Sequence, residues 1–369
     1  MLKSDHRAWL EIDLGAIEQN VRSLLSVLSP QTQLLAVVKA DAYGHGSVAV
    51  SRAAVRAGAR WLGVATLPEG VELRKAGITV PILILGGITT PAEVRSLYEY
   101  QLQATIYSAE QAVMFSQVLP EHIKIPVHLK VDTGMSRLGV NYQQAREFYR
   151  FLTGLCQLDI VGVYSHFATA DDPDPTVMNL QSDRFQQLLQ SLDYVPPLVH
   201  ICNTAGLLVN PQLHYQLVRA GLGIYGYYPA PHLRSCVTLK PAMTIKARIT
   251  YIKKVKAGTG ISYGYSFITD RDLTVATVAI GYADGLWRGL SSKICGYLRG
   301  QKVRQIGTIT MDQCLIDVSD VPSAKVGDVV TWLGGDHDTT ADDWAEILGT
   351  ISWEILCGFK HRLPRLYNS

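Results

Sequence analysis

The stretch that decides the fold is Ala36-Val-Val-Lys39-Ala-Asp-Ala-Tyr43-Gly-His-Gly46. Its start belongs to an apolar run, residues 34–38, that is typical of a strand buried on both faces. Lys39 stands where this strand ends, and a turn of small residues and glycines follows it. An amine at the rim of a buried strand is partly desolvated, which lowers its pKa and suits it to Schiff-base chemistry or proton transfer. A lysine that merely extends its ammonium group to solvent is the structural alternative.

Apolar runs of the same kind recur through the first two-thirds of the chain, with amphipathic, helix-like segments between them. The strand-like runs are residues 34–38, 61–65, 81–85, 104–107, 127–131, 160–164, 198–201 and 217–220. The helix-like segments include 91–99, 109–118, 143–155 and 181–192. Eight buried strands alternating with helices predict a (β/α)₈ barrel of the TIM type, with an open doubly wound sheet as the alternative. In a barrel, the chemistry belongs at the carboxyl ends of the strands, where Lys39 stands.

The pattern changes after Pro229, where β-branched and alternating runs replace the alternation of strands and helices. They cover residues 245–251, 273–281, 302–307, 311–318 and 329–333, and one helix is expected at 341–348. We therefore predict an α/β protein with two domains. Residues 1–235 form the barrel, and residues 236–369 form a mainly β C-terminal domain.

Composition narrows the function classes. Hydrophobic residues make up 47% of the 369 positions, and the net charge of +2 comes without a long basic run, so no nucleic-acid partner is expected. No apolar run is long enough for a membrane span, and the N-terminal residues lack a signal region. The six cysteines are scattered without Cys-x-x-Cys spacing, which indicates a reducing cytoplasm and no metal site.

Two short motifs are typical of proteins with other functions. The stretch Gly221-Leu-Gly-Ile-Tyr-Gly226 fits a dinucleotide fingerprint, but prolines follow where a helix should begin. Its exposed backbone amides still suit a phosphate. The stretch Gly260-Ile-Ser262-Tyr-Gly264 fits a hydrolase elbow, but no helix follows, so Ser262 is a poor nucleophile candidate.

Ordered motifs run along nearly the whole chain, and together they resemble the bacterial alanine racemases, a family that depends on pyridoxal 5′-phosphate. Besides the Lys39 stretch, the motifs are Leu10-Glu-Ile-Asp-Leu, Lys130-Val-Asp-Thr-Gly-Met-Ser-Arg137-Leu-Gly139, Ser165-His166-Phe-Ala, Asn203-Thr-Ala, Arg219-Ala-Gly-Leu-Gly-Ile-Tyr-Gly226, Ile261-Ser-Tyr263-Gly and Thr310-Met-Asp-Gln313. The first motif alone would admit other pyridoxal-phosphate barrels. The motifs around Tyr263 and Met311 point to the racemases.

The resemblance implies catalytic roles for four residues. Lys39 would carry the cofactor as an internal aldimine and act as one base, while Tyr263 of a partner subunit would be the other. Two opposed bases suit racemisation, because one removes the proton from Cα and the other returns it from the far side. A phenol has an unperturbed pKa near 10, so Tyr263 needs help. In the family that help comes through His166 and Arg219, both present here.

The resemblance also implies binding roles. The cofactor would be held by Lys39, Tyr43, Asn203, Thr204, Arg219, Gly221 and Leu222, and the substrate by Arg137, Met311 and Asp312. Lys130 matches a lysine that is carbamylated in some relatives. Trp353 departs from the family pattern, which commonly has tyrosine there.

The expected function is therefore that of a cytoplasmic, homodimeric isomerase, an alanine racemase that supplies D-alanine for peptidoglycan. A related racemase acting on serine or lysine is one alternative. A non-enzymatic carrier of pyridoxal phosphate is another, although a carrier would not need the domain that contains Tyr263.

Overall fold

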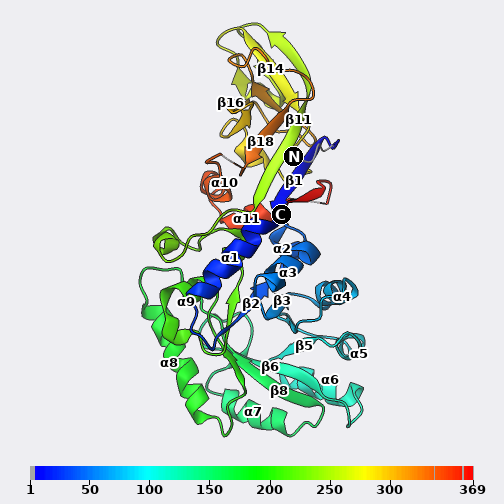
Figure 1. Ribbon diagram of the computed structural model, residues 1–369, viewed down its shortest axis with the longest axis vertical. Coiled ribbons are helices and arrows are strands. Elements are labelled where there is room, and N and C mark those ends of the chain that lie inside the picture. Colours follow the sequence, from blue (N-terminus) through cyan, green and yellow to red (C-terminus); the bar gives the residue numbers. More distant parts are fainter. Residues whose placement is uncertain (1–4, 336, 360, 369) are drawn as a thin grey trace. The chain divides into compact units, whose positions relative to one another are not determined.

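The computed structural model describes residues 5–335, 337–359 and 361–368, which form two compact units (Figure 1). The first, here called the barrel unit, comprises Ala16–Ala42 and Ser47–Lys240. The second, the β unit, comprises the described residues of Met1–Gly15, Tyr43–Gly46 and Pro241–Ser369. Within the described ranges, no helix is both long and apolar enough to cross a bilayer.

The barrel unit contains a parallel sheet whose path runs β10-β2-β3-β4-β5-β6-β8-β9. Its strands are β2 (Gln33–Val37), β3 (Trp61–Val64), β4 (Ile82–Ile84), β5 (Gln103–Ile106), β6 (Ile125–Asp132), β8 (Leu158–Tyr164), β9 (Leu198–His200) and β10 (Leu217–Ala220); the short β7 (Val140–Asn141) pairs with β6. The two ends of the path meet, because the Gln216 amide donates to the Val199 carbonyl at 3.2 Å and the Arg219 amide to the Cys202 carbonyl at 3.0 Å. The prediction of a TIM-type barrel of eight strands is confirmed, and the open-sheet alternative is wrong.

The helices of this unit follow the strands in alternation. They are α3 (Ser47–Arg56), α4 (Leu67–Lys75), α5 (Pro91–Glu99), α6 (Ala109–Val118), α7 (Ala145–Thr153), α8 (Thr176–Ser191) and α9 (Thr204–Val209), while α1 (Leu14–Ser26) precedes β2. The predicted bounds of α5 and α6 are confirmed. Local capping explains this agreement, because Thr90 and Ser108 accept backbone hydrogen bonds at the starts of the two helices. Helix α8 begins at residue 176, before the predicted 181, where Asp174 accepts the Thr176 amide at 2.9 Å.

The β unit is built around a sheet with the strand order β14-β17-β16-β15-β18-β11-β1-β19. Its strands are β1 (Ala8–Asp13), β11 (Met243–Val255), β14 (Leu273–Val278), β15 (Cys295–Leu298), β16 (Gln301–Ile306), β17 (Cys314–Asp317), β18 (Val329–Leu333) and β19 (Arg365–Asn368). A separate hairpin joins β12 (Gly260–Ile261) to β13 (Phe267–Ile268), and the helices are α10 (Ala341–Leu348) and α11 (Ser352–Cys357). The prediction of a mainly β C-terminal domain is confirmed.

Strand β1 lies in the range predicted for the barrel, residues 1–235, but its hydrogen bonds join it to the sheet of the β unit. It pairs antiparallel with β11 and parallel with β19, so both ends of the chain lie in this one sheet (Figure 1, blue and red arrows). The strand predicted at 311–318 begins only at Cys314. The preceding residues form a turn instead, in which the Thr310 amide donates to the Gln313 carbonyl at 2.9 Å.

Candidate active site

Lys39 lies two residues after the last residue of β2, Val37, and begins a left-handed turn. In α2 (Lys39–Tyr43), the residues Ala40, Asp41 and Ala42 have φ of 53°, 54° and 52° with ψ near the same values, so the turn is left-handed. An L-residue in this region costs about 1–2 kcal/mol. Such a run persists only where its surroundings hold it, and strained backbone of this kind clusters at functional sites.

Arg219 of β10 is the polar centre of the barrel unit and is 4% exposed. Its Nη1 donates to His200 Nδ1 at 2.8 Å. Its Nη2 contacts His166 Nδ1 and the carbonyl oxygens of Ser165 and Ile201, each at 2.9 Å. The structure therefore brings together Arg219 and His166, two of the predicted catalytic residues.

Sequence reasoning missed two histidines that continue this network. His200 Nε2 lies 3.0 Å from His128 Nδ1, and His128 Nε2 lies 2.9 Å from Gln103 Oε1. The available signal was a single imidazole in each of two largely apolar strands, β6 and β9. A buried polar side chain requires a partner, so each ring predicted another polar group nearby, but not which one.

The guanidinium sets the protonation of these rings, because it can only donate hydrogen bonds. His166 and His200 must accept at Nδ1, so His200 donates from Nε2 to His128, which donates from Nε2 to Gln103. Burial, followed by the charge of Arg219, lowers the pKa of His128 to about 3. The same two causes hold the pKa values of His166 and His200 well below the usual range. All three imidazoles are therefore neutral at pH 7.

Lys130 of β6 is 7% exposed, and its Nζ lies 4.4 Å from the centre of the Tyr164 ring. Burial, with repulsion from Arg219 and Arg137, holds the pKa of Lys130 well below its ordinary value. These surroundings therefore favour the neutral, nucleophilic form of its amine. Arg137 is exposed and makes no hydrogen bond to the described part of the chain, so its forked donors are available to a ligand.

Thr204 organises the loop that was predicted to bind phosphate. Its Oγ1 accepts the Gly221 amide at 3.0 Å and the Gly223 amide at 3.4 Å. The Gly221 amide, expected to contact phosphate, is therefore engaged by Thr204, and Leu222 begins the 3₁₀ turn Leu222–Tyr225. Neighbouring Asn203 caps α9, with Oδ1 accepting the Gly206 amide at 2.9 Å.

In the β unit, Tyr263 lies in the 3₁₀ turn Tyr263–Tyr265 between β12 and β13, and its side chain is 74% exposed. The backbone of this turn is nevertheless anchored. Thr308 Oγ1 donates to the Tyr263 carbonyl at 2.9 Å, and Ser262 Oγ donates to the Thr308 carbonyl at 2.7 Å. Ser262 donates to a carbonyl, so the contact does not activate it as a nucleophile. Tyr43, also in this unit, is buried, and burial raises its pKa above the ordinary value.

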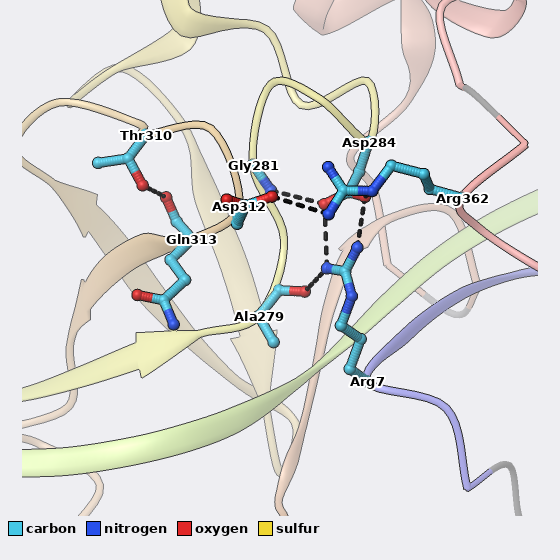
Figure 2. Close-up of polar contacts among 8 residues, drawn as sticks. All are labelled: Arg7, Ala279, Gly281, Asp284, Thr310, Asp312, Gln313 and Arg362. Carbon is cyan, nitrogen blue, oxygen red and sulfur yellow. Dashed lines mark hydrogen bonds and ion pairs between the residues drawn. The ribbon is translucent and has the colours of Figure 1, made fainter.

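Residues 310–313 form a turn that presents Met311 and Asp312, both exposed. The Ala283 amide donates to the Met311 carbonyl at 3.0 Å, which joins this turn to the segment that carries Asp284. Asp284 is fully buried and accepts two hydrogen bonds from Arg7, at 2.6 and 3.1 Å (Figure 2). Arg362 connects Asp284, at 3.5 Å, to Asp312, at 2.7 Å. The predicted substrate residue Asp312 is therefore ion-paired.

Comparisons with known proteins identify the family of this chain. Residues 12–229 match the family model "Alanine racemase, N-terminal domain", and residues 242–367 match "Alanine racemase, C-terminal domain". The chain belongs to the alanine racemase family. The alanine racemases of Nostoc sp. and Synechocystis sp. are 55% and 52% identical to this chain; the matches cover 98% of the chain and 95% and 98% of the relatives.

Solved alanine racemases share the fold. That of Clostridium difficile 630 superposes with a TM-score of 0.94 at 34% identity, covering 99% of this chain and 97% of its own. That of E. faecalis has a TM-score of 0.94 at 36% identity, with full coverage of both chains. Pyridoxal 5′-phosphate is the cofactor of the alanine racemase family.

The donors in the barrel unit fit this cofactor. The Nε–H of buried Arg219 has no acceptor among the described residues, although both terminal nitrogens are engaged. A donor without an acceptor on a largely buried side chain suits the nitrogen of a pyridine ring. Lys39 supplies an amine for covalent attachment, and Thr204 with the Leu222 turn supplies donors of the kind that phosphate requires.

Proposed function

We propose that this protein interconverts L-alanine and D-alanine and supplies D-alanine for peptidoglycan in the cytoplasm. The observation that carries the proposal is the 2.9 Å contact between Arg219 and His166 Nδ1 within the buried histidine network. That contact determines which ring nitrogen of His166 carries a proton, and a proton-transfer reaction depends on this. When bound, the cofactor delocalises the electron pair left on the substrate's Cα.

Two bases of this chain would move the α-proton. Lys39 Nζ would exchange it on one face of the substrate, and the hydroxyl of Tyr263 from a second chain would exchange it on the other. An exposed tyrosine at the tip of an anchored turn suits a side chain that reaches into a neighbouring subunit. We therefore propose a homodimer in which residues 236–369 of one chain complete the site in the barrel of the other.

His166 would tune the second base. Because Nδ1 accepts from Arg219, the ring carries its proton on Nε2, where it can donate to a phenolate oxygen. A donor to the charged form lowers the pKa of a phenol. With Nδ1 engaged by Arg219 and the proton on Nε2, His166 has no free lone pair with which to compete for the substrate proton.

Arg219 would face the nitrogen of the cofactor's ring through its Nε–H. A guanidinium donates a hydrogen bond without giving up its proton, so the ring nitrogen is not protonated. Arg219 would thereby keep the ring a weak electron acceptor, which would favour return of the proton to Cα over transfer to the cofactor.

The remaining predicted residues would bind and orient. Tyr43, Thr204 and Leu222 would contact the phosphate, while Gly221 and Asn203 would hold the loop and helix that carry these donors. Arg137 would hold the substrate carboxylate, with Met311 and Asp312 of the partner subunit closing the pocket. Carbamylation of Lys130 would add a negative charge that braces Arg137. In this step the neutral amine forms a bond to the carbon of CO₂ and releases a proton.

A racemisation assay tests the proposal, with each isomer of alanine, serine and lysine as substrate and optical rotation as the readout. Alanine should react fastest in both directions, and borohydride should attach the cofactor covalently to Lys39. Faster racemisation of serine or lysine would favour the related racemase. Bound cofactor without racemisation of any amino acid would favour the carrier.

A further inference from the structure

The left-handed turn after Lys39 needs an external partner that keeps it in place. Ala40 is the first residue of the turn with positive φ, and its backbone carries strain that an alanine side chain does not offset. Further along the turn, Asp41 Oδ1 accepts the Ser47 amide at 2.8 Å, and the Ala42 amide donates to the Val38 carbonyl at 2.9 Å. These contacts hold the far end of the turn, so the residue next to Lys39 requires a separate contact.

Glu69 provides that contact from the neighbouring βα segment. Its Oε1 accepts the Ala40 amide at 2.7 Å. Its Oε2 accepts the amides of Ala65 and Thr66, at 2.7 and 3.1 Å. One carboxylate therefore ties the end of β2 to the end of β3. Since the acceptor is an ionised carboxylate, these hydrogen bonds are of the stronger, charge-assisted kind.

The next βα segment shows what an ordinary capping glutamate does. Glu93 occupies the same position in α5 as Glu69 in α4, and both belong to a capping box. Glu93 Oε2 accepts the amides of Thr89 and Thr90, at 2.8 and 3.0 Å, and every contact lies within its own turn. Glu69 differs because it uses its second oxygen on Ala40.

We propose that Glu69 is a positioning residue for Lys39. Its carboxylate holds the Ala40 amide, so the left-handed turn is maintained and the Lys39 main chain, from which the amine projects, stays in one place. This inference rests on the proposed role of Lys39, but the hold on the turn can be measured without the cofactor.

The test compares Glu69→Gln with the matched control Glu93→Gln, because both variants weaken a capping box and only the first affects Ala40. In the cofactor-free protein, Glu69→Gln should accelerate hydrogen exchange of the amides at 40–43 by about tenfold or more, as expected for loss of a charge-assisted hydrogen bond. Glu93→Gln should leave exchange there unchanged. Equal exchange in the two variants would overturn the proposal and leave Glu69 as a helix cap.

A second readout is borohydride labelling of Lys39 across pH. Glu69→Gln should slow labelling and change its pH profile, while Glu93→Gln should match the unsubstituted protein. Absence of labelling at Lys39 in the unsubstituted protein would overturn the proposed function, and hydrogen exchange would still decide whether Glu69 holds the turn. If Glu69→Gln melts far below Glu93→Gln, adding Ala40→Gly should recover the melting temperature, because glycine adopts positive φ without strain. No recovery would overturn the role assigned to the Ala40 contact.

Discussion

The Nδ1 atom of His128 lies 3.0 Å from Nε2 of His200, and this contact extends the reach of Arg219 to a second strand of the barrel. From Arg219 through His200 and His128 to Gln103, each group then donates a hydrogen bond to the next. Protonating either ring would place a donor against a donor. The network is therefore stable only with neutral imidazoles, and this predicts how the protein responds to acid.

Stability should fall with pH below about 6.5, the ordinary pKa of histidine. Burial and Arg219 lower the pKa of His128 to about 3 in the folded state, so between these values the unfolded chain binds more protons. The free energy of unfolding should then drop by about 1.4 kcal/mol per pH unit for each such ring as pH falls. Urea denaturation between pH 7 and pH 4 measures this slope, and His128→Asn should make it shallower. An unchanged slope would show that the surroundings of His128 do not lower its pKa in the folded protein.

Shared active sites can be tested by complementation. Lys39→Ala and Tyr263→Phe should each abolish racemisation, since each removes one base. Co-expression of the two chains should restore about a quarter of the activity of the unsubstituted protein, because half of randomly formed dimers are hybrids with one intact site. Inactive hybrids, isolated with two different affinity tags, would mean that both bases come from one chain.

Lys130 should form a carbamate, because burial and two arginines lower the pKa of its amine and favour the neutral, nucleophilic form. In ¹³C-labelled bicarbonate, the protein should give a carbamate signal that Lys130→Met lacks. The exposed Lys124 provides the matched control, and Lys124→Met should retain the signal. If Arg137 depends on this charge, Lys130→Met should raise KM for alanine by about tenfold, the equivalent of one weakened charged contact. A signal that survives in Lys130→Met would assign the carbamate to another amine.

Asp284 should control the turn that presents Met311. Asp284→Asn leaves Arg7 and Arg362 facing a neutral group, and we expect a loss of stability of about 1–3 kcal/mol. The Met311 turn should also become mobile, so KM should rise more than kcat falls. Asp328→Asn is the control, since Asp328 pairs with Arg299 in the same unit, 2.8 Å away, and makes no hydrogen bond or ion pair with the turn in the described part of the chain. Similar kinetic changes in both variants would show that Asp284 stabilises the unit in general and has no specific effect on the Met311 turn.

Local patterns in the sequence were sufficient for the barrel and for much of the site. Apolar runs such as residues 34–38 and 61–65 predict strands because burial on both faces excludes polar residues over a short, contiguous span. The caps at Thr90 and Ser108 determine where α5 and α6 begin, and both act within a few residues. Lys39, His166 and Arg219 each stand in a short motif at a strand end, and the resemblance of these motifs to a known family led to the roles proposed for them.

Only the tertiary structure decided which distant residues meet. The pairing of β1 with β11 and β19 joins the two ends of the chain, and nothing in the local period of an apolar strand names its partner. His128, His200 and Gln103 look like isolated exceptions in the sequence, and they form a network because their strands lie in one closed barrel. Glu69 and Glu93 have the same local signature, a glutamate three residues after a threonine cap. Glu69 differs from Glu93 because the barrel places the strained Ala40 amide within 2.7 Å of its carboxylate.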